Sequence, residues 1–396
     1  MKRKQMYIGV AILLIACVIG VCTYRIAMDQ QSGFTGSKIF HFGKNSDVSG
    51  EKETPAADDN GKEETTSEEI KDVPEEQEKT DVSEKQDNKY PEITTKGKVR
   101  QYKQTGVVVA GNAAFEMYSY VDNVAGRYTK AVNNLTKTLD SGVDVYDMII
   151  PTSVGITFPD NKKGKSASSS QSKSLQKIET KLSGREKFVP LYDIMMQHRD
   201  EYEYFRTDHH WTALGAYYAY TAFCEQKGLQ ATEISAYKKK NFGKFLGTFY
   251  NETNENKSLK ADTVDAYYPQ SKNVKVIYED VNGKKYKGSV ITNASDYGVS
   301  MKYLAFINGD QPFMTIQNKD KHDGTSCIVV KESFGNAFVP FLVDHYETIY
   351  VIDYRYWQGK LSQFVKKKRA KEVILINNIS MTRNAYLIGR FTQAVS

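Results

Sequence analysis

The sequence predicts an α/β fold: a parallel sheet flanked by helices, carrying an antiparallel insertion and preceded by one transmembrane helix and a disordered linker. Three observations support this prediction. Residues 326–378 alternate apolar strands with short helices, residues 6–24 are apolar and uncharged, and residues 47–92 are strongly acidic. Helical crossovers between successive strands are typical of parallel sheets.

The N-terminal segment predicts a membrane anchor. At ~1.5 Å per residue, the uncharged run at 6–24 nearly spans a ~30 Å hydrocarbon core. Lys2, Arg3 and Lys4 precede it, so the positive-inside bias places the N-terminus in the cytoplasm and the rest outside. A cleaved signal peptide is the alternative, and both predict export. We expect an anchor at residues 1–30 of a single-pass cell-membrane protein with an extracellular domain.

Charge divides the remaining chain. Residues 47–92 hold 17 acidic and 6 basic residues and few large aliphatic side chains. Such a segment cannot bury enough apolar surface to fold, and we expect a disordered acidic linker at 31–99. Residues 93–396 carry a net charge of +12. No nucleic-acid-binding motif accompanies this charge, and the expected location argues against a nucleic-acid partner.

Cysteine usage excludes a disulfide scaffold. The chain has 4 cysteines, and two of them lie in the apolar N-terminal run. Whether Cys224 and Cys327 pair stays open.

Hydrophobic periodicity predicts the elements of one domain at 100–396. Residues 106–111 and 143–151 indicate strands, and residues 123–142 indicate an amphipathic helix. A further helix begins near Thr212 and ends at Gly228. Asn282-Gly283 separates two strand-like runs and predicts a hairpin, within an antiparallel insertion at 240–300.

The C-terminal strands predict where a site lies, because ligands of parallel sheets bind beyond the carboxyl ends of the strands. Those ends carry Ser333, then Asp353 and Arg355, then Asn377 and Asn378. Ser333 opens a tight turn into a helix, which presents its hydroxyl and aims free backbone N–H groups at an oxyanion. An N-cap serine is the alternative.

The segment 206–212 (RTDHHWT) supplies partners for such a serine. His210 is a candidate base, Asp208 a carboxylate that fixes the imidazole tautomer, and Trp211 a wall of the pocket. Two alternatives stay open. One is a metal site made of His198, Asp208, His209 and His210, which no second cluster of carboxylates or cysteines supports. The other is a helix cap at Asp208 with surface histidines.

The TDHHWT segment and the strand ending in KESFGNAFVPF together resemble the DHHW family, which is similar to the SGNH-hydrolase-like domains of bacterial alginate O-acetylation proteins. The resemblance covers roughly residues 100–396 and implies a catalytic triad of Asp208, His210 and Ser333. It further implies Arg355 as an anion or substrate contact and Asn377 as an oxyanion donor. Asn336 and Trp211 complete our oxyanion and substrate-binding candidates. Glu332 stands where the family's Gly-Asp-Ser block has Asp.

The resulting expectation is an extracytoplasmic Ser-His-Asp acyl-transfer enzyme that works through an acyl-Ser333 intermediate. The resemblance implies an O-acetyltransferase or an acetylesterase acting on a cell-surface polysaccharide. Transfer needs an acyl donor outside the cell, so a membrane-bound O-acyltransferase is the expected partner, and no cofactor is expected. The alternative is a non-catalytic cell-surface glycan-binding module, which the basic charge and the aromatic side chains favour.

Overall fold

The computed structural model describes residues 98–165 and 168–396. The predicted anchor and nearly all of the predicted linker lie outside these residues and stay predictions. Within the described part, no helix combines the length and the apolar character needed to cross a bilayer.

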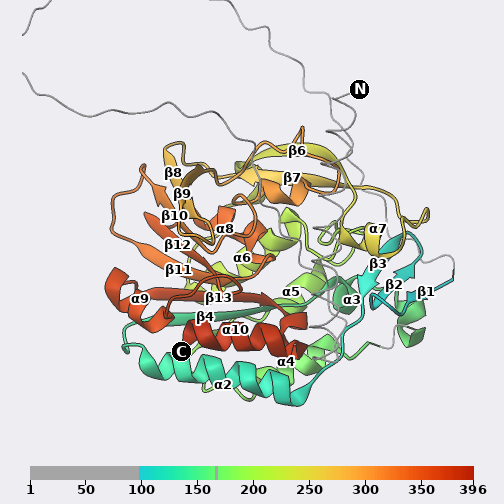
Figure 1. The fold of residues 1–396 in the computed structure, drawn as a ribbon, viewed down its shortest axis with the longest axis horizontal. Helices are drawn as coiled ribbons and strands as arrows, with labels where there is room; N and C mark the ends of the chain where they lie inside the picture. The colour runs from blue at the N-terminus through green and yellow to red at the C-terminus, as the bar shows by residue number, and fades with distance from the viewer. Residues whose placement is uncertain (1–97, 166–167) are drawn as a thin grey trace, which may run out of the picture. The chain divides into compact units, whose positions relative to one another are not determined.

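An eight-stranded mixed sheet organises the described region (Figure 1). Five neighbouring strands, in the order β5-β4-β13-β11-β12, are parallel, and β10, β8 and β9 continue the sheet in antiparallel pairing. The strands are β4 (Asp144–Ile150), β5 (Lys187–Phe188), β8 (Val274–Glu279), β9 (Lys285–Gly288), β10 (Phe313–Asn318), β11 (Ser326–Lys331), β12 (Thr348–Asp353) and β13 (Glu372–Asn378). The α/β prediction is therefore confirmed as a mostly parallel, mixed sheet.

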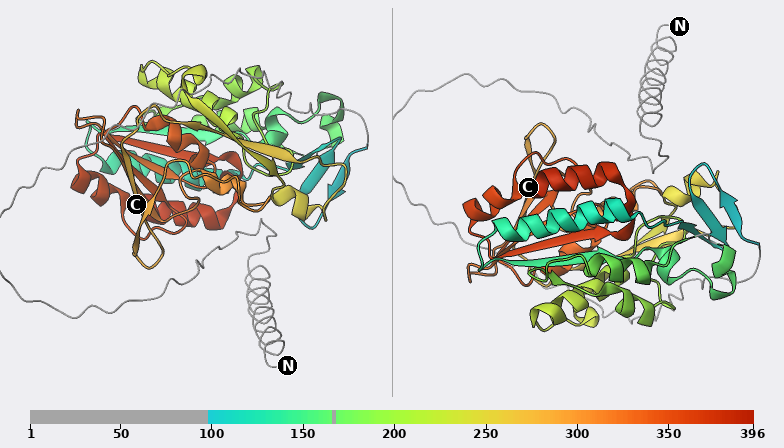
Figure 2. Two further views of the ribbon diagram at one scale, coloured as in Figure 1. Left: turned by 90° about the horizontal axis from the view of Figure 1, so that it is seen from above. Right: turned by 90° about the horizontal axis from the view of Figure 1, so that it is seen from below.

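Helices cover both faces of the sheet (Figure 2). One face packs against α2 (Asp122–Thr138), α9 (Leu361–Lys368) and α10 (Ala385–Val395), and the other against α5 (Leu191–Gln197), α6 (Ala213–Lys227) and α8 (Gly335–Leu342). Because side chains alternate along a strand, β4 serves both layers. Val145 and Ile149 join the core beside α2, whereas the Tyr146 ring lies 5.0 Å from the Phe223 ring of α6.

Smaller elements surround this core. A three-stranded antiparallel sheet comprises β1 (Arg100–Tyr102), β2 (Val107–Ala110) and β3 (Ala113–Glu116), and a separate pair comprises β6 (Lys238–Phe245) and β7 (Asp262–Tyr268). The short helices are α3 (Ser153–Ile156), α4 (Gln171–Glu179) and α7 (Thr248–Glu252), with 3-10 turns η1 (Asp160–Lys165), η2 (Ile234–Ala236), η3 (Lys302–Ala305) and η4 (Ile379–Arg383).

The segment predicted as one antiparallel insertion serves two structures. β6 and β7 form their own pair, whereas the β8–β9 hairpin extends the main sheet. The hairpin turns at the predicted Asn282-Gly283, where Gly283 has φ +77°. This left-handed conformation is the one that tight hairpin turns require.

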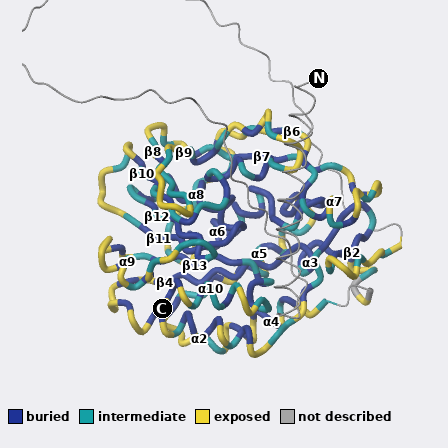
Figure 3. Tube along the Cα trace, viewed as in Figure 1, coloured by how far each residue is buried: buried dark blue, intermediate teal, exposed yellow. Residues whose placement is uncertain are grey.

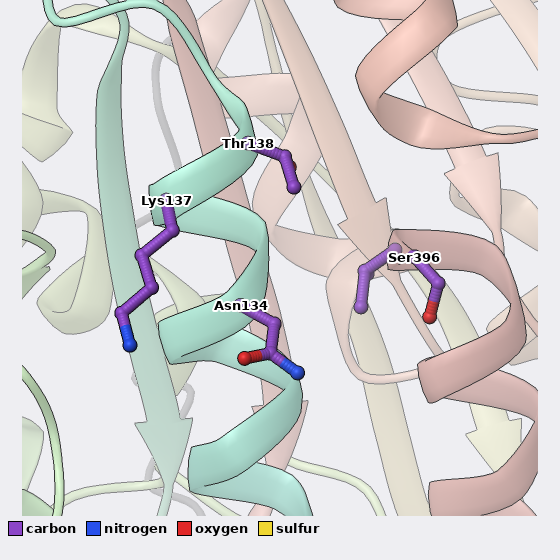
Figure 4. A pocket seen from close by; sticks show the side chains of 5 residues that line it. Asn134, Lys137, Thr138 and Ser396 are labelled. Atoms are coloured by element: carbon purple, nitrogen blue, oxygen red, sulfur yellow. The ribbon is translucent and has the colours of Figure 1, made fainter.

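The predicted site and a surface pocket lie at opposite ends of the parallel strands. The central parallel strands are largely buried (Figure 3), and Ser333, Arg355 and Asn377 stand at or just beyond the carboxyl ends of β11, β12 and β13. At the amino edge, a surface pocket lies between the last turns of α2 and α10 (Figure 4), lined by Asn134, Lys137, Thr138, Val395 and Ser396. None of the predicted site residues lines that pocket.

Candidate active site

Ser333 lies in the turn between β11 and α8. The residue that caps α8 is Phe334, without a side-chain hydrogen bond, so Ser333 is not the N-cap serine of the alternative interpretation. The Glu332 carboxylate holds the turn instead: it accepts hydrogen bonds from the backbone N–H of Phe334 (3.2 Å) and of Asn378 at the end of β13 (3.0 Å). The Ser333 hydroxyl also has an acceptor within the turn, because Glu332 Oε2 lies 3.3 Å from its Oγ.

The loop that carries the two adjacent histidines runs between α5 and α6 and is fixed from β7. The buried Asp262 carboxylate accepts hydrogen bonds from the backbone N–H of Arg206 (2.9 Å) and Thr207 (2.7 Å) and from the Tyr202 hydroxyl (2.8 Å). Thr212 caps α6 by accepting from the N–H groups of the first turn. Asp208 is therefore not the cap of this helix and is available for other partners.

The structure brings Asp208, His210 and Ser333 together. His210 Nε2 lies 2.8 Å from Ser333 Oγ, and His210 Nδ1 lies 2.6 Å from Asp208 Oδ1. The other Asp208 oxygen accepts a hydrogen bond from the backbone N–H of Thr248 (2.8 Å). All three predicted triad members are at least 90% buried, so water competes little for these bonds.

Electrostatics assigns the tautomer of His210. Burial alone would raise the pKa of Asp208, but the imidazoles of His209 and His210, with the hydrogen bonds it accepts, hold that pKa well below its usual range. An ionised carboxylate only accepts hydrogen bonds, so Nδ1 of His210 carries the hydrogen. In the neutral ring Nε2 is then an acceptor, and at 2.8 Å it lies closer to the Ser333 hydroxyl than Glu332 Oε2 does at 3.3 Å.

Two aromatic side chains fix the imidazole and the serine turn. The Tyr303 ring stacks on His210 with centroids 4.0 Å apart, and its hydroxyl donates to the Ser333 carbonyl (3.1 Å). The Trp211 indole donates to the Phe334 carbonyl (2.9 Å). Because Trp211 is 0% exposed, the structure does not place it on a pocket wall as predicted: it ties the histidine loop to the serine turn.

Arg355 lies in a network of opposite charges, not at a free anion site. Its Nε and Nη2 donate to Asp353 (2.8 and 2.6 Å), and Nη2 also lies 2.9 Å from Asp310. Lys331 donates to the same Asp353 (3.0 Å). The predicted anion contact therefore needs correction, because two neighbouring carboxylates already neutralise this guanidinium.

The two predicted asparagines differ in position: Asn336 lies beside the serine turn, whereas Asn377 lies in the core. The Asn336 amide donates to Asp310 (2.9 Å), and its own backbone N–H donates to the Ser333 carbonyl (3.2 Å). Asn377 is 0% exposed, and within the described residues neither its amide nitrogen nor its amide oxygen has a hydrogen-bond partner. The structure thus does not bring Asn377 to the serine as an oxyanion donor, because its strand position turns it into the core.

The backbone N–H groups after Ser333 also differ from the prediction. Those of Phe334, Gly335 and Asn336 donate to the Glu332 carboxylate, the Glu332 carbonyl and the Ser333 carbonyl respectively. The sequence predicts that these groups are free for an oxyanion. They are bonded because the turn closes on itself before α8 begins.

The metal alternative loses one of its four residues. His198 instead bonds Glu201 (2.7 Å) and stacks on Tyr218. It does not belong to the cluster formed by the other three residues. Among the described residues, Asp208, His209 and His210 are close enough to offer three ligand atoms to a metal. His209, however, bonds Thr248 (2.7 Å), and an ion held by one nitrogen of His210 would replace the bond of that nitrogen, either to Asp208 or to Ser333.

Comparison with known proteins decides the family. The model of the DHHW protein family matches residues 62–352, which include the Asp-His-His-Trp segment at 208–211 and the Ser333 turn. The chain belongs to the DHHW family.

Solved structures share the fold of this DHHW protein. A DHHW family protein from Eubacterium siraeum is 29% identical, with a TM-score of 0.66, over 73% of this chain and 95% of that one. Bacillus cereus PatB1 is 18% identical, with a TM-score of 0.60, over 71% of this chain and 98% of that one. A structure of PatB1 with a sulfonyl adduct has a TM-score of 0.61 at 18% identity, over 71% and 97% of the two chains. No curated protein matches the sequence.

Two residues that hold the site were missed by sequence reasoning. Asp262 and Asp310 lie on a strand and in a loop, and neither belongs to a recognisable motif. The only local signal was the segment KYLAFINGD (302–310), which ends in Asp310 and begins beside the Tyr303 that stacks on His210.

Proposed function

We propose that this DHHW protein is a serine acyl-transfer enzyme in which Ser333 is the nucleophile, His210 the general base and acid, and Asp208 the group that orients His210. One observation carries the proposal: the unbroken line of hydrogen bonds from Ser333 through His210 to an ionised Asp208, with separations of 2.8 and 2.6 Å. A nucleophile, a base in contact with it and an orienting carboxylate are the parts that acyl transfer requires.

In the proposed reaction, Ser333 Oγ attacks the carbonyl carbon of an acyl ester while its proton passes to His210 Nε2. The tetrahedral intermediate collapses, the bond to the leaving alcohol breaks, and His210 returns the proton to that alcohol. An acceptor hydroxyl then gives its proton to His210, attacks the acyl-Ser333 ester and releases Ser333, which recovers the proton. Asp208 stays ionised throughout.

The oxyanion is assigned to Asn336. Its amide nitrogen carries two hydrogens, one of which bonds Asp310, and it stands on the first turn of α8 beside Ser333. A donor preorganised at this position is the usual means of stabilising the developing negative charge.

The finer part of the proposal concerns substrate and location. We infer an acetyl group as the transferred acyl group and a cell-surface polysaccharide as its acceptor from the family resemblance, and the extracellular location from residues 1–30. A membrane-bound O-acyltransferase would then supply the acetyl group. Whether water or a sugar receives the acyl group separates an esterase from a transferase.

The test uses the full-length chain and phenylmethanesulfonyl fluoride, since a sulfonyl adduct has been seen on the shared fold in PatB1. Mass spectrometry of the digested protein should find one adduct, on Ser333. Release of nitrophenol from 4-nitrophenyl acetate should fall about 10³-fold or more in Ser333→Ala and in His210→Ala. The matched control, Ser295→Ala, changes an exposed serine and should keep the wild-type rate.

An unmodified Ser333 after treatment, together with equal nitrophenol release by wild type and Ser333→Ala, would refute the proposed reaction. The glycan-binding module would then be the better interpretation.

A further inference from the structure

Asp310 is the most exposed member of a network of four charged side chains, which also contains Lys331, Asp353 and Arg355. Its Oδ1 accepts hydrogen bonds from Asn336 (2.9 Å) and Lys331 (3.4 Å), and its Oδ2 lies 2.9 Å from Arg355 Nη2. The side chains of Lys331, Asp353 and Arg355 are 1%, 0% and 9% exposed, whereas that of Asp310 is 30% exposed. Of these four charged groups, Asp310 is therefore the one that a substrate can touch.

The loop that presents Asp310 has an unusual backbone. Ile307, Asn308 and Gly309 have φ values of +43°, +58° and +72°, three successive residues in the left-handed region. A β-branched residue rarely adopts this conformation, which costs about 1–3 kcal/mol and is found where a site needs a fixed geometry. The bond from Ile307 N–H to the Val290 carbonyl (2.9 Å) holds the loop in place.

The same loop contacts the reacting residues. Tyr303, seven positions before Asp310, stacks on His210 and donates to the Ser333 carbonyl. Asn336 bonds both Asp310, through its side chain, and the Ser333 carbonyl, through its backbone N–H. Asp310 is thus joined to Ser333 through one residue.

The charges around Asp310 set what it can bind. Burial works against its ionisation, but the neighbouring Arg355 and Lys331 outweigh that effect and hold the pKa of Asp310 well below its usual range. Both cations are also bonded to Asp353. A ligand that reaches this side of the site therefore meets an ionised acceptor and cations already occupied by carboxylates.

We infer that Asp310 is a specificity-determining residue that receives hydrogen bonds from hydroxyl or ammonium groups of the acyl acceptor and disfavours acceptors that carry carboxylates. This inference rests on the proposed function and adds the chemical class of the acceptor: a neutral or amino sugar, not a uronic acid.

Binding tests this inference without turnover. Isothermal titration calorimetry on full-length Ser333→Ala, at about 150 mM salt to screen the basic surface, compares cellotetraose, a glucosamine tetramer and tetragalacturonate. The neutral and amino tetramers should bind at least about tenfold more tightly than tetragalacturonate, since like charges at a binding site are strongly unfavourable. Adding Asp310→Asn, which keeps an acceptor and removes the charge, should narrow the difference to about threefold.

Two variants control the comparison. Asp296→Asn removes an exposed carboxylate elsewhere and should leave the ratio of the three dissociation constants unchanged. Asp310→Glu keeps the charge and should keep the discrimination against tetragalacturonate. If Asp310→Asn does not fold, the Ser333→Ala protein alone still tests the preference. A roughly tenfold weaker affinity for tetragalacturonate than for cellotetraose supports the inference, and equal affinities overturn it.

Tetragalacturonate binding as tightly as cellotetraose, a ratio that Asp310→Asn leaves unchanged, or no binding of any tetramer would each overturn the inference. A chain that shows the expected ratio but forms no sulfonyl adduct on Ser333 refutes the proposed reaction only. An adduct with the opposite ratio refutes the preference only.

Discussion

Gly247 is the position where the smallest substitution should cost the most activity. It precedes α7 and passes so close to Asp208 that an added Cβ would lie 2.2 Å from Oδ2 and 2.3 Å from Cβ of that residue. Its φ of −88° suits any residue, so Gly247→Ala tests this contact alone. Ordinary contacts begin at 3.4 Å, so Asp208 or the backbone must move by about 1 Å.

A shift of that size breaks the triad. Moving Asp208 by about 1 Å stretches its 2.6 Å bond to His210 beyond hydrogen-bonding distance. Displacements on this scale cost about 10²-fold in rate, and loss of the orienting carboxylate about 10⁴-fold. We therefore expect Gly247→Ala to label with phenylmethanesulfonyl fluoride, and to hydrolyse 4-nitrophenyl acetate, 10²- to 10⁴-fold more slowly than wild type.

The control for this prediction is Gly298→Ala, at an exposed position where the nearest atom to an added Cβ is 3.9 Å away. Both variants are first checked for folding by urea denaturation, because overpacking at Gly247 should lower the free energy of unfolding by about 1–3 kcal/mol. A folded Gly247→Ala protein that reacts within about threefold of wild type would show that Asp208 is not needed where the structure places it.

Three further substitutions probe the supports of the site, each read by urea denaturation. Asp262→Asn should lower the free energy of unfolding by about 2–4 kcal/mol, because the NH₂ group of the new amide would face buried N–H donors of the histidine loop. The control Asp265→Asn should lower it by less. Trp211→Phe removes a buried donor and should cost about 1–3 kcal/mol; an unchanged value contradicts that bond. Burial raises the pKa of Glu203 from 4.5 to about 9, so wild-type stability should fall between those pH values, by up to about 6 kcal/mol, and Glu203→Gln should flatten the curve. If wild type and Glu203→Gln lose stability in parallel as the pH rises, the raised pKa of Glu203 is refuted.

Local sequence patterns predicted the C-terminal half of the sheet well. β11, β12 and β13 are continuous apolar runs because helices cover both faces of the sheet. The two helices between them, α8 and α9, are predicted from their hydrophobic periodicity. The meeting of Asp208 and His210 with Ser333 was also predictable, since chemistry links these residue types and the carboxyl edge limits where they can meet.

The remaining parts depend on contacts between distant segments. β10 pairs with both β12 and β8, which no local pattern reveals, and the strand at 106–111 joins a separate sheet. Arg355 was placed at the correct strand end, but its charge is neutralised from Asp310 on another loop. A prediction from strand ends alone places Arg355 beside Asp353 and misses the second carboxylate, that of Asp310.

The site is held together by carboxylates that bond backbone amides of separate segments. Asp208 joins its loop to Thr248, Asp262 holds the histidine loop from β7, and Glu332 joins the serine turn to β13. Burial raises the pKa of Asp262 and of Glu332, yet the pKa of Asp208 is lowered. The difference follows from their partners, because Asp208 faces two imidazoles whereas Asp262 accepts mainly from neutral donors. The contacts that hold the histidine loop thus also keep Asp208 ionised, as its proposed role beside His210 requires.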